Sequence, residues 1–435
     1  MWLKASLPRP ILRYGSDNGG ISVSLWARLS LAPVATALIA VACVGGSGGG
    51  GDGDADTEPG PDSSGNPDVE ERIPSVATDW NTDWSKRTIS LSELVIGIQR
   101  QDPRDIIPPI DNPQFDTVEE AAQWLVDREP VVLLELEGEA RAYPLRILTS
   151  HEVVNDKVGS RSVVVTYCPL CNSAVTFDRE LDGRVLRFGV SGLLRKSDLV
   201  MWDQQTESLW QQITGEGIVG ELAGTTLEFV SSPLVSWEDF RTKFPDGKVL
   251  SREQGIYPPQ VYDNQPYAGY DSSRQPFLFR GEPDDRYQAM ERVVAMRING
   301  ANKAYPFSVI SEELAVNDEM EGTPVLVVFG AADTASVLDT GDVSTGRAVG
   351  VGLAYERTVA DRVLTFDPEG EDRFVDRETG SVWDLFGSAV EGPLTGEQLT
   401  PVINTNELWF AWAAFNPDAP VYTGSSTASQ SDFRY

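Results

Sequence analysis

The chain contains an internal duplication, and this repeat restricts its fold more than any other feature. Residues 142–156 (AYPLRILTSHEVVND) align without a gap with residues 304–318 (AYPFSVISEELAVND), and in both copies a polar turn and an apolar run follow. Further matches occur in the same order: Asp203 to Trp210 with Asp376 to Trp383, Leu222 with Leu394, Trp237 with Trp409, and Pro245-Asp246 with Pro417-Asp418. A period this long predicts two related lobes, over residues 129–252 and 291–423, rather than a solenoid.

Each lobe opens on short runs of strand-forming residues. Val131 to Glu137 and Ser162 to Tyr167 are apolar and β-branched, which predicts buried strands. Pro144 to Val153 predicts a short helix with proline in its first turn. Asp182-Gly183 predicts a tight hairpin turn. We therefore expect a strand-rich α+β fold made of two duplicated β-rich lobes with short helices.

The N-terminal region predicts export. Leu31 to Ala42 is an apolar run after Arg28 that is too short to span a bilayer and fits the core of a signal peptide, here residues 1–42. It ends in Ala40-Val41-Ala42 before Cys43, which resembles a bacterial lipobox and predicts a lipid on Cys43. The alternatives are an ordinary cleaved signal with a free Cys43 and an uncleaved anchor.

Residues 43–71 are predicted to form a disordered tether. Gly51 to Glu71 holds eight acidic residues and no basic one, so this stretch cannot bury a core. Signal, cysteine and tether in this order predict an exported protein whose lipid anchors it to a membrane of the cell envelope. If the envelope has two membranes, Val44 after the cysteine favours the periplasmic face of the outer membrane.

Three further segments lie outside the lobes. Residues 72–128 are a leading segment with a short helix, for which Asp116 and Glu119 predict a capping box. Residues 253–290 form a crossover rich in Tyr and Pro, which we expect to be ordered by aromatic burial. Residues 424–435 are a C-terminal tail.

Composition excludes some classes of function. The net charge is −31, and a nucleic-acid partner is not expected because phosphate binding needs clusters of Lys and Arg. The chain has no P-loop, no dinucleotide-binding fingerprint, no HExxH and no GxSxG nucleophile elbow.

Differences between the two copies point to a site in the first lobe. Residues that both copies share, such as Tyr143, Asn155 and Asp203, are interpreted as structural. Four residues of the first copy face a different type in the second: His151 (Glu313), Cys168 (Gly330), Cys171 (Asp333) and Met201 (Phe374). The chain has one His and three Cys, so with Cys43 assigned to the lipid its remaining Cys and its His all lie in this region.

The Cys168-Pro-Leu-Cys171 motif allows three roles. A strand precedes it, and Ala174 to Phe177 predicts another strand rather than the helix whose N-terminus lowers a thiol pKa, so a thioredoxin fold is not expected. Asn172 stands where haem attachment needs His. Thiol redox chemistry, metal binding and a structural disulfide remain open, although a disulfide would close a very small loop and stabilise little by entropy.

The preferred hypothesis is thiol–disulfide or related redox chemistry, which would make the protein a thiol oxidoreductase with an unidentified redox or protein partner. Cys168 and Cys171 would attack and resolve, and His151 would lower the thiol pKa or relay a proton. The alternative is a copper or zinc site of the same three residues, with Met201 or a carboxylate such as Glu152 as fourth ligand. A scaffold protein with a Cys168–Cys171 staple is the third hypothesis.

A polar loop follows the motif. It holds Ser191-Gly192, Arg195-Lys196 and Ser197-Asp198. Its composition predicts a solvated turn, with anion binding near the cysteines as the alternative.

Four segments resemble a known bacterial family. They are residues 150–156 (SHEVVND), 166–172 (TYCPLCN), 188–194 (FGVSGLL) and 197–211 (SDLVMWDQQTESLWQ). They look like the family called domain of unknown function 3179, as does the leading stretch DIIPPIDNPQF, and the likeness runs from about 88 to 423. The resemblance implies an exported protein but no substrate. Some members are selenoproteins, which implies that a cysteine of the motif can be selenocysteine and favours redox chemistry over a structural disulfide.

Overall fold

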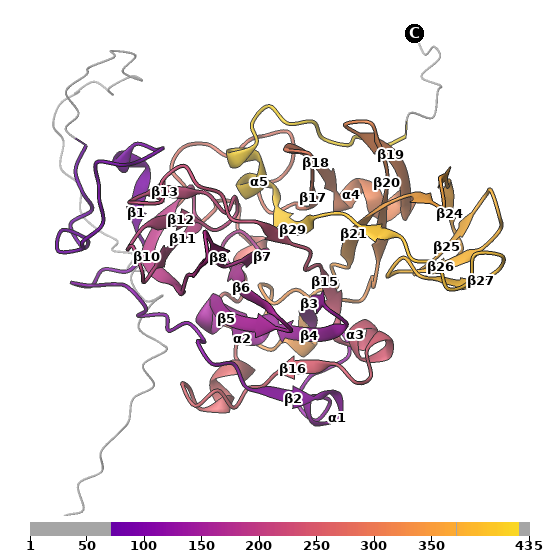
Figure 1. Cartoon of the computed structure of the whole chain (residues 1–435), viewed down its shortest axis with the longest axis horizontal. Coiled ribbons are helices and arrows are strands. Elements are labelled where there is room, and N and C mark those ends of the chain that lie inside the picture. The colour runs from indigo at the N-terminus through magenta and orange to yellow at the C-terminus, as the bar shows by residue number, and fades with distance from the viewer. Residues whose placement is uncertain (1–70, 371, 426–435) are drawn as a thin grey trace, which may run out of the picture. The chain divides into compact units, whose positions relative to one another are not determined.

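The computed structural model describes residues 71–370 and 372–425. These residues form a strand-rich α+β structure with short helices, which confirms the predicted fold class (Figure 1). The predicted signal peptide, Cys43, nearly all of the acidic tether and most of the C-terminal tail lie outside the described residues. Within the described part of the chain, no helix has the length and apolar character needed to cross a membrane.

The first repeat runs from β3 to α3. Its elements are β3 (Pro130–Leu136), β4 (Glu139–Pro144), α2 (Leu145–His151), β5 (Val153–Val158), β6 (Arg161–Cys168), β7 (Ser173–Asp178), β8 (Glu180–Leu181), β9 (Arg184–Val185), β10 (Phe188–Arg195), β11 (Asp198–Asp203), β12 (Leu209–Gln211), β13 (Gly217–Val219), β14 (Phe229–Val230), β15 (Leu234–Ser236) and α3 (Trp237–Lys243).

The second repeat runs from β17 to α5. Its elements are β17 (Arg292–Ile298), β18 (Ala301–Pro306), α4 (Phe307–Glu313), β19 (Ala315–Met320), β20 (Thr323–Gly330), η5 (Val343–Thr345), β21 (Val351–Glu356), β22 (Thr358–Val359), β23 (Arg362–Val363), β24 (Phe366–Pro368), β25 (Arg373–Asp376), β26 (Val382–Asp384), β27 (Ala389–Glu391), β28 (Thr400–Pro401), β29 (Asn404–Leu408) and α5 (Trp409–Phe415).

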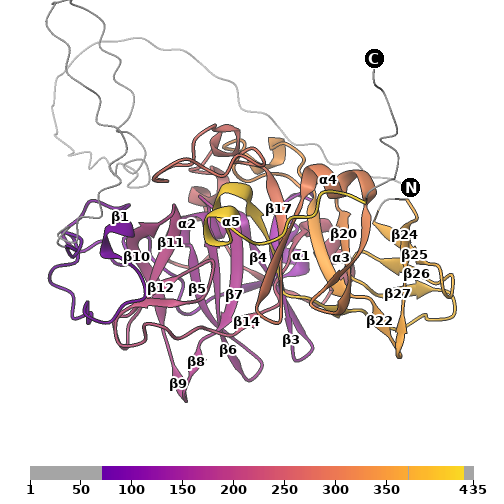
Figure 2. The ribbon, with the colours of Figure 1, turned by 90° about the horizontal axis from the view of Figure 1, so that it is seen from above.

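Each repeat builds the same three sheets. The order β14-β7-β6-β5 recurs as β28-β21-β20-β19, β10-β11-β12-β13 as β24-β25-β26-β27, and β15-β3-β4 as β29-β17-β18. Figure 2 shows the strands of the first repeat, in magenta, beside those of the second, in orange. Both repeats belong to one compact unit, and the lobe limits given above stay predictions.

The remaining elements flank the repeats. β1 (Leu94–Ile96) pairs with β10, and β16 (Lys248–Leu250) and β2 (Phe115–Thr117) extend the sheet of β4. The other short elements are η2 (Leu91–Glu93), α1 (Val118–Ala121), η3 (Pro259–Asp263) and η4 (Tyr270–Ser272). α1 does open with a capping box, but its partners are Thr117 and Glu120, one residue later than predicted.

Residues that the two copies share carry the same hydrogen bonds. The indole N–H of Trp210 donates to Asp203 at 3.0 Å, and that of Trp383 donates to Asp376 at 3.0 Å. The Tyr hydroxyls repeat this relation in the pairs Tyr143–Asp156 and Tyr305–Asp318. These side chains satisfy buried polar atoms in both repeats, so they support the fold.

The repeats differ in the connection after their long central strand. Residues 169–172 join β6 to β7, whereas residues 331–350 join β20 to β21. Cys168 and Gly330 both end the strand and correspond to each other. Cys171 and Asp333 still hold the same position in the turn that opens each connection, because the N–H of Asn172 donates to Pro169 and that of Thr334 donates to Ala331.

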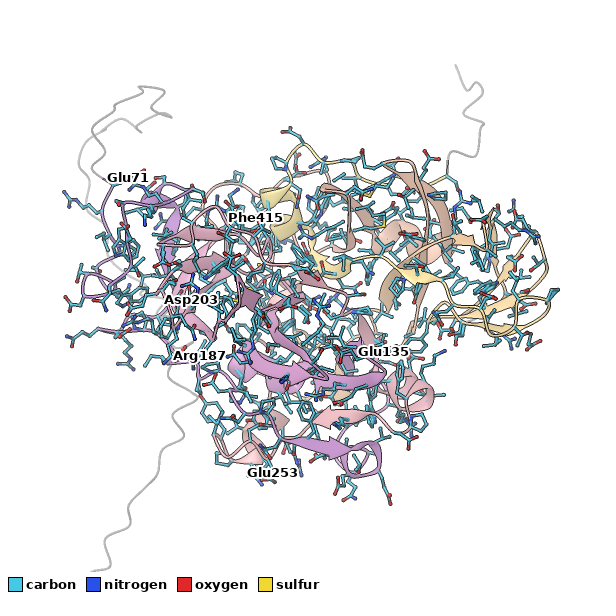
Figure 3. All side chains as sticks on the ribbon, viewed as in Figure 1. Glu71, Glu135, Arg187, Asp203, Glu253 and Phe415 are labelled. Atoms are coloured by element: carbon cyan, nitrogen blue, oxygen red, sulfur yellow. The ribbon has the colours of Figure 1, made fainter. Side chains whose placement is uncertain are left out.

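The core around the cysteines draws on both repeats. β29 lies beside β7, and Leu408 and Phe410 pack in the same cluster as Cys168, Cys171 and Trp210. Figure 3 shows side chains filling the space between the sheets, with Phe415 of α5 labelled where α5 approaches the first repeat. The cysteine motif therefore lies at the junction of the repeats.

Candidate metal centre

Cys168 and Cys171 flank a tight turn between two strands. Cys168 ends β6 and pairs with Ser173 at the start of β7, and the N–H of Cys171 donates to the carbonyl of Cys168 at 3.2 Å. Asn172 has a φ of 50°, a left-handed conformation that asparagine tolerates. A strand follows, as predicted, so the motif itself does not open a helix.

Asp198 comes to the same place from the β10–β11 hairpin. Arg195 pairs with Asp198, and the two turn residues Lys196 and Ser197 have φ values of 54° and 69°. Both Ser197 and Asp198 are completely buried. The prediction of a solvated turn here was wrong, because the loop packs inside the molecule beneath a later segment.

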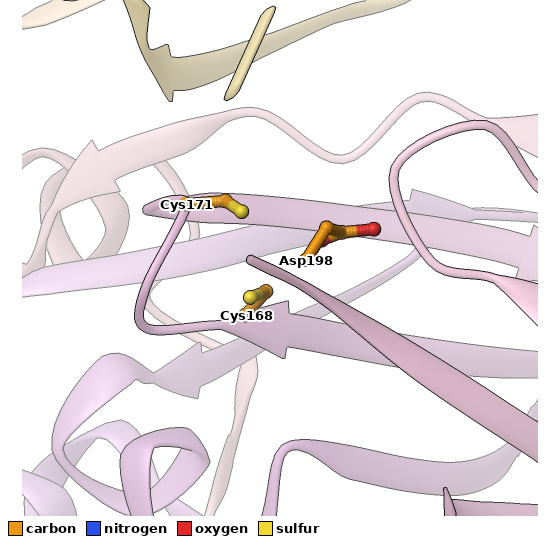
Figure 4. A group of neighbouring side chains, drawn as sticks. All are labelled: Cys168, Cys171 and Asp198. Carbon is orange, nitrogen blue, oxygen red and sulfur yellow. The ribbon is translucent and has the colours of Figure 1, made fainter. Parts of the chain in front are cut away.

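The three side chains form one compact group. The two sulfur atoms and one carboxylate oxygen of Asp198 all lie within 4.8 Å of one another (Figure 4). Both cysteines are free, and Cys168 is 2% and Cys171 0% exposed. In a tetrahedral site with ligand bonds of about 2.0–2.3 Å, ligand atoms lie roughly 3.3–3.8 Å apart, so the group needs at most a small contraction to hold one ion.

The carboxylate of Asp198 is only half satisfied by protein donors. Its Oδ2 accepts from the amide of Gln211 at 2.6 Å and from the N–H of Ile213 at 3.0 Å. Its Oδ1 is buried and has no N–H or O–H donor among the described residues. A buried oxygen without a donor is costly, which makes it a candidate ligand atom.

Burial dominates the electrostatics of the group. It raises the pKa of both thiols, and that of Cys171 far above its usual value. Burial also raises the pKa of Asp198 to about 6, although hydrogen bonds from Gln211, Ile213 and the thiols of Cys171 and Cys168 act in the opposite direction. Without a cation the thiols are therefore neutral at pH 7.

The structure does not bring His151 into this group. Its Nδ1 lies 2.6 Å from the carbonyl oxygen of Pro108 and its Nε2 lies 2.7 Å from the hydroxyl of Tyr262, so both ring nitrogens are occupied. A neutral ring satisfies both contacts, with Nδ1 donating and Nε2 accepting. Burial lowers the pKa of His151 to about 4, which agrees with this neutral form.

Met201 is a core residue of β11. It pairs with Trp210 on β12 and is completely buried in the cluster that also contains the cysteines.

Glu152, the residue after the histidine, faces the group instead. It is 7% exposed, and its carboxyl accepts a long hydrogen bond of 3.4 Å from the hydroxyl of Tyr267. Burial raises the pKa of Glu152 to about 8. The sequence had named Glu152 only as one carboxylate among candidates for a fourth ligand.

The crossover segment covers the group. The hydroxyl of Ser197 donates to the carbonyl of Phe277 at 2.5 Å, and the N–H of Phe277 donates to the hydroxyl of Tyr270 at 3.3 Å. Tyr267, Tyr270 and Phe279 pack against the cluster that contains the cysteines. These contacts close the site to solvent.

Sequence analysis missed Asp198 as a site residue. The available signal was its place beside the polar loop that was considered for anion binding near the cysteines, at the start of the strand that carries Met201. Nothing in the local sequence showed that this loop is buried.

Two β-rich repeats with a buried Cys-Cys-Asp group at their junction define a class of strand-rich protein with a candidate metal centre. The chain belongs to the family described as "Protein of unknown function (DUF3179)", which matches residues 104–419 and confirms the resemblance. No curated protein and no solved structure matches the chain.

Proposed function

We propose that this protein binds one zinc ion through Cys168, Cys171 and Asp198. The observation that carries the proposal is the buried Oδ1 of Asp198, which has no N–H or O–H donor among the described residues and belongs to a carboxylate that faces two free thiols. Thiolate and carboxylate are both ligands of zinc.

The raised pKa of each thiol supports metal binding over nucleophilic chemistry. A thiol nucleophile acts as thiolate, and reactive cysteines have a lowered pKa and an exposed sulfur. Cys168 and Cys171 have neither. A cation displaces the thiol protons and balances the negative charge of the buried thiolates. Burial is therefore compatible with a metal site.

The donor set favours zinc over copper. The copper hypothesis relied on His151, whose two nitrogens already have partners. Asp198 supplies a hard oxygen in its place, which zinc accepts more readily than copper(I) does.

The proposal includes the location predicted from the sequence. A lipid on Cys43 would hold the metal centre at a membrane of the cell envelope, with the acidic segment as spacer. Cys43 lies outside the described residues, so this part depends on the sequence pattern alone.

The test is the zinc content of the purified protein. We expect one equivalent of zinc by elemental analysis, and the loss of that zinc in both Cys168→Ser and Asp198→Asn. His151→Gln is expected to keep it. The control for the carboxylate is Asp182→Asn, an exposed aspartate in a hairpin turn of the same repeat.

Two results would overturn the metal proposal. One is wild-type protein that takes up no zinc, or copper in its place, after dialysis against the metals. The other is zinc that survives in Asp198→Asn and in Cys168→Ser, which would place the metal elsewhere.

A dithiol redox role is the second candidate, and the proximity of two free sulfur atoms favours it. In that reaction the two thiols would form a disulfide, losing two electrons and two protons, while an external disulfide is reduced to two thiols. Incubation with glutathione disulfide would lower the protein mass by two hydrogens. Burial of both sulfur atoms predicts that this exchange is slow in the folded protein.

A further inference from the structure

Glu152 is a buried acid at a position where the second repeat has leucine. Glu152 follows α2 with a φ of 60°, and its carbonyl accepts the N–H of Tyr167 at 2.8 Å. Leu314 follows α4 with a φ of 60°, and its carbonyl accepts the N–H of Phe329 at 2.9 Å. The two residues therefore occupy the same backbone position in the two repeats.

The fold itself does not require a carboxyl at this position. The second repeat builds the same helix end and the same strand contact with an apolar side chain, as Leu314 shows. Burying an acid without strong partners costs free energy, and the carboxyl of Glu152 receives a hydrogen bond of 3.4 Å from Tyr267, which is longer than a normal one. The carboxyl is best explained by a role other than folding.

Its position connects this carboxyl to the cysteine group. Because the carbonyl of Glu152 bonds to Tyr167, the residue lies next to Cys168 along the neighbouring strand. A charge on Glu152 raises the pKa of Cys168, and a charge on Asp198 raises the pKa of Glu152, as expected for neighbouring acids. The hydroxyl of Tyr267, in the crossover, donates to the carboxyl.

We propose that Glu152 is the fourth ligand of the ion held by Cys168, Cys171 and Asp198, and that Tyr267 orients its carboxylate. This inference rests on the zinc proposal above. Three protein ligands leave one position open, whereas a zinc site that is closed to solvent has four. The carboxylate of Glu152 lies outside the 4.8 Å group, so ligation requires rotation of its side chain.

The charge of such a site has a precedent in zinc chemistry. Two thiolates and two carboxylates around a divalent ion give the same net charge as four thiolates, which is a common structural site. A tyrosine that donates to the ligating carboxylate is the kind of outer contact that fixes ligand orientation. The inference makes this a closed centre for holding zinc rather than an open centre for activating water.

The test uses the full chain loaded with Co²⁺ in place of zinc, because cobalt reports its ligands in the visible spectrum. Wild type is expected to show two thiolate charge-transfer bands and no response to added azide. In Glu152→Leu the thiolate bands persist, azide shifts the ligand-field bands, and the affinity for Co²⁺ falls about tenfold or more. Tyr267→Phe is expected to weaken binding to a smaller extent.

The control is Glu321→Leu. Glu321 also has a left-handed backbone, with a φ of 49°, but it is exposed in a turn of the second repeat. This variant should match wild type in affinity and in its lack of response to azide. Glu152→Leu is expected to fold, because leucine occupies the equivalent position in the second repeat.

The outcomes separate the two proposals. If wild type binds neither Co²⁺ nor zinc, the zinc proposal itself fails. If wild type binds Co²⁺ through two thiolates but responds to azide as Glu152→Leu does, with the same affinity, the metal centre stands and the assignment of Glu152 is overturned.

Discussion

Glu152 and His151 are neighbours in the chain, yet they lie in different surroundings. α2 ends at His151, and the left-handed conformation of Glu152 turns the chain sharply into β5. The histidine ring therefore contacts Pro108 and Tyr262, while the next side chain faces the cysteine group. The left-handed φ of Glu152 therefore directs these two neighbouring side chains to different surroundings.

We predict that the zinc-free protein loses stability as the pH rises through neutrality, because of Glu152. Its pKa is raised from 4.5 to about 8 in the fold, so the native state binds more protons than the unfolded state between these values. Stability from this group is complete below about pH 4.5 and falls as the pH rises to 8. Glu152→Leu should remove this loss and, at pH 8, stabilise the zinc-free protein on the order of 2–4 kcal/mol.

Urea unfolding with a chelator present measures this effect at pH 4.5 and at pH 8. The gain in Glu152→Leu should be large at pH 8 and small at pH 4.5. Glu321→Leu, at its exposed position, should show the same difference from wild type at both values. An equal gain at both values in Glu152→Leu would mean that apolar packing, and not ionisation, explains its effect.

Sequence reasoning at this scale identified candidate residue types but not which side chains approach the cysteines. Cys168 and Cys171 were predictable because the motif is local and both residues belong to one turn. Asp198 comes from the β10–β11 hairpin and Glu152 from the turn between α2 and β5, and their approach to the cysteines depends on how these elements pack. A lone histidine close in sequence was a poor guide, because the turn after α2 carries it away.

At the scale of elements, the crossover controls access to the centre. It has little regular structure, yet it places Tyr267, Tyr270 and Phe279 against the core around the cysteines. The hydroxyl of Ser197 in the β10–β11 turn donates to the carbonyl of Phe277. Tyr270 also interacts with the Ser197 side chain, and its hydroxyl accepts the N–H of Phe277. We expect a bound ion to leave after these contacts open.

We therefore predict that Ser197→Ala and Tyr270→Phe speed the release of zinc. Loss of one hydrogen bond that closes the site should shift the opening equilibrium by about 0.5–1.5 kcal/mol, which is about 2- to 10-fold in rate. The measurement is stopped-flow transfer of zinc to a fluorescent chelator in excess. The equilibrium affinity should change less than the rate, because opening speeds both uptake and release.

Ser273→Ala is the matched control for this experiment. The hydroxyl of Ser273 donates to Gln275 within the crossover itself, so its loss should leave the release rate unchanged. Equal rates in wild type, Ser197→Ala and Tyr270→Phe would show that the ion leaves by another route.

Most of the elements were accessible from sequence, because the hydrophobic pattern of β3 and β6 and the Asp182-Gly183 turn depend on local chemistry. The turn residues have φ values of 50° and 74°, as the predicted hairpin requires. The offset between the copies rises from 162 residues at Cys168 and Gly330 (330 − 168) to 173 at Asp203 and Asp376 (376 − 203), so the sequence shows an insertion but not its place after β20. Only the structure shows that the extra residues of the second repeat follow a turn that corresponds to the cysteine turn.

At the scale of the whole molecule, the second repeat completes the surroundings of a centre whose candidate ligands all lie in the first. The N–H of Leu408 in β29 donates to the carbonyl of Cys171 at 2.9 Å, and the amide of Asn172 donates to the carbonyl of Asn406 at 3.1 Å. Phe410 and Ala411 of α5 extend the same core. The first repeat thus supplies the candidate ligands, and the second repeat packs around them.

Because of these contacts, we predict that zinc stabilises both repeats together. At a free zinc concentration 100 times the dissociation constant, linkage adds about 2.7 kcal/mol to the free energy of unfolding. β24–β27 supply none of the proposed ligands. If the repeats unfold as one unit, those amides of β24–β27 that exchange through global unfolding should still gain the same protection from zinc as amides of β10–β13. Hydrogen exchange followed by mass spectrometry measures both sets in one sample, and Cys168→Ser, which lacks a ligand, should gain no protection in either. Protection that rises in β10–β13 alone would show that the repeats unfold separately and that the contacts of β29 with the cysteine turn do not couple them.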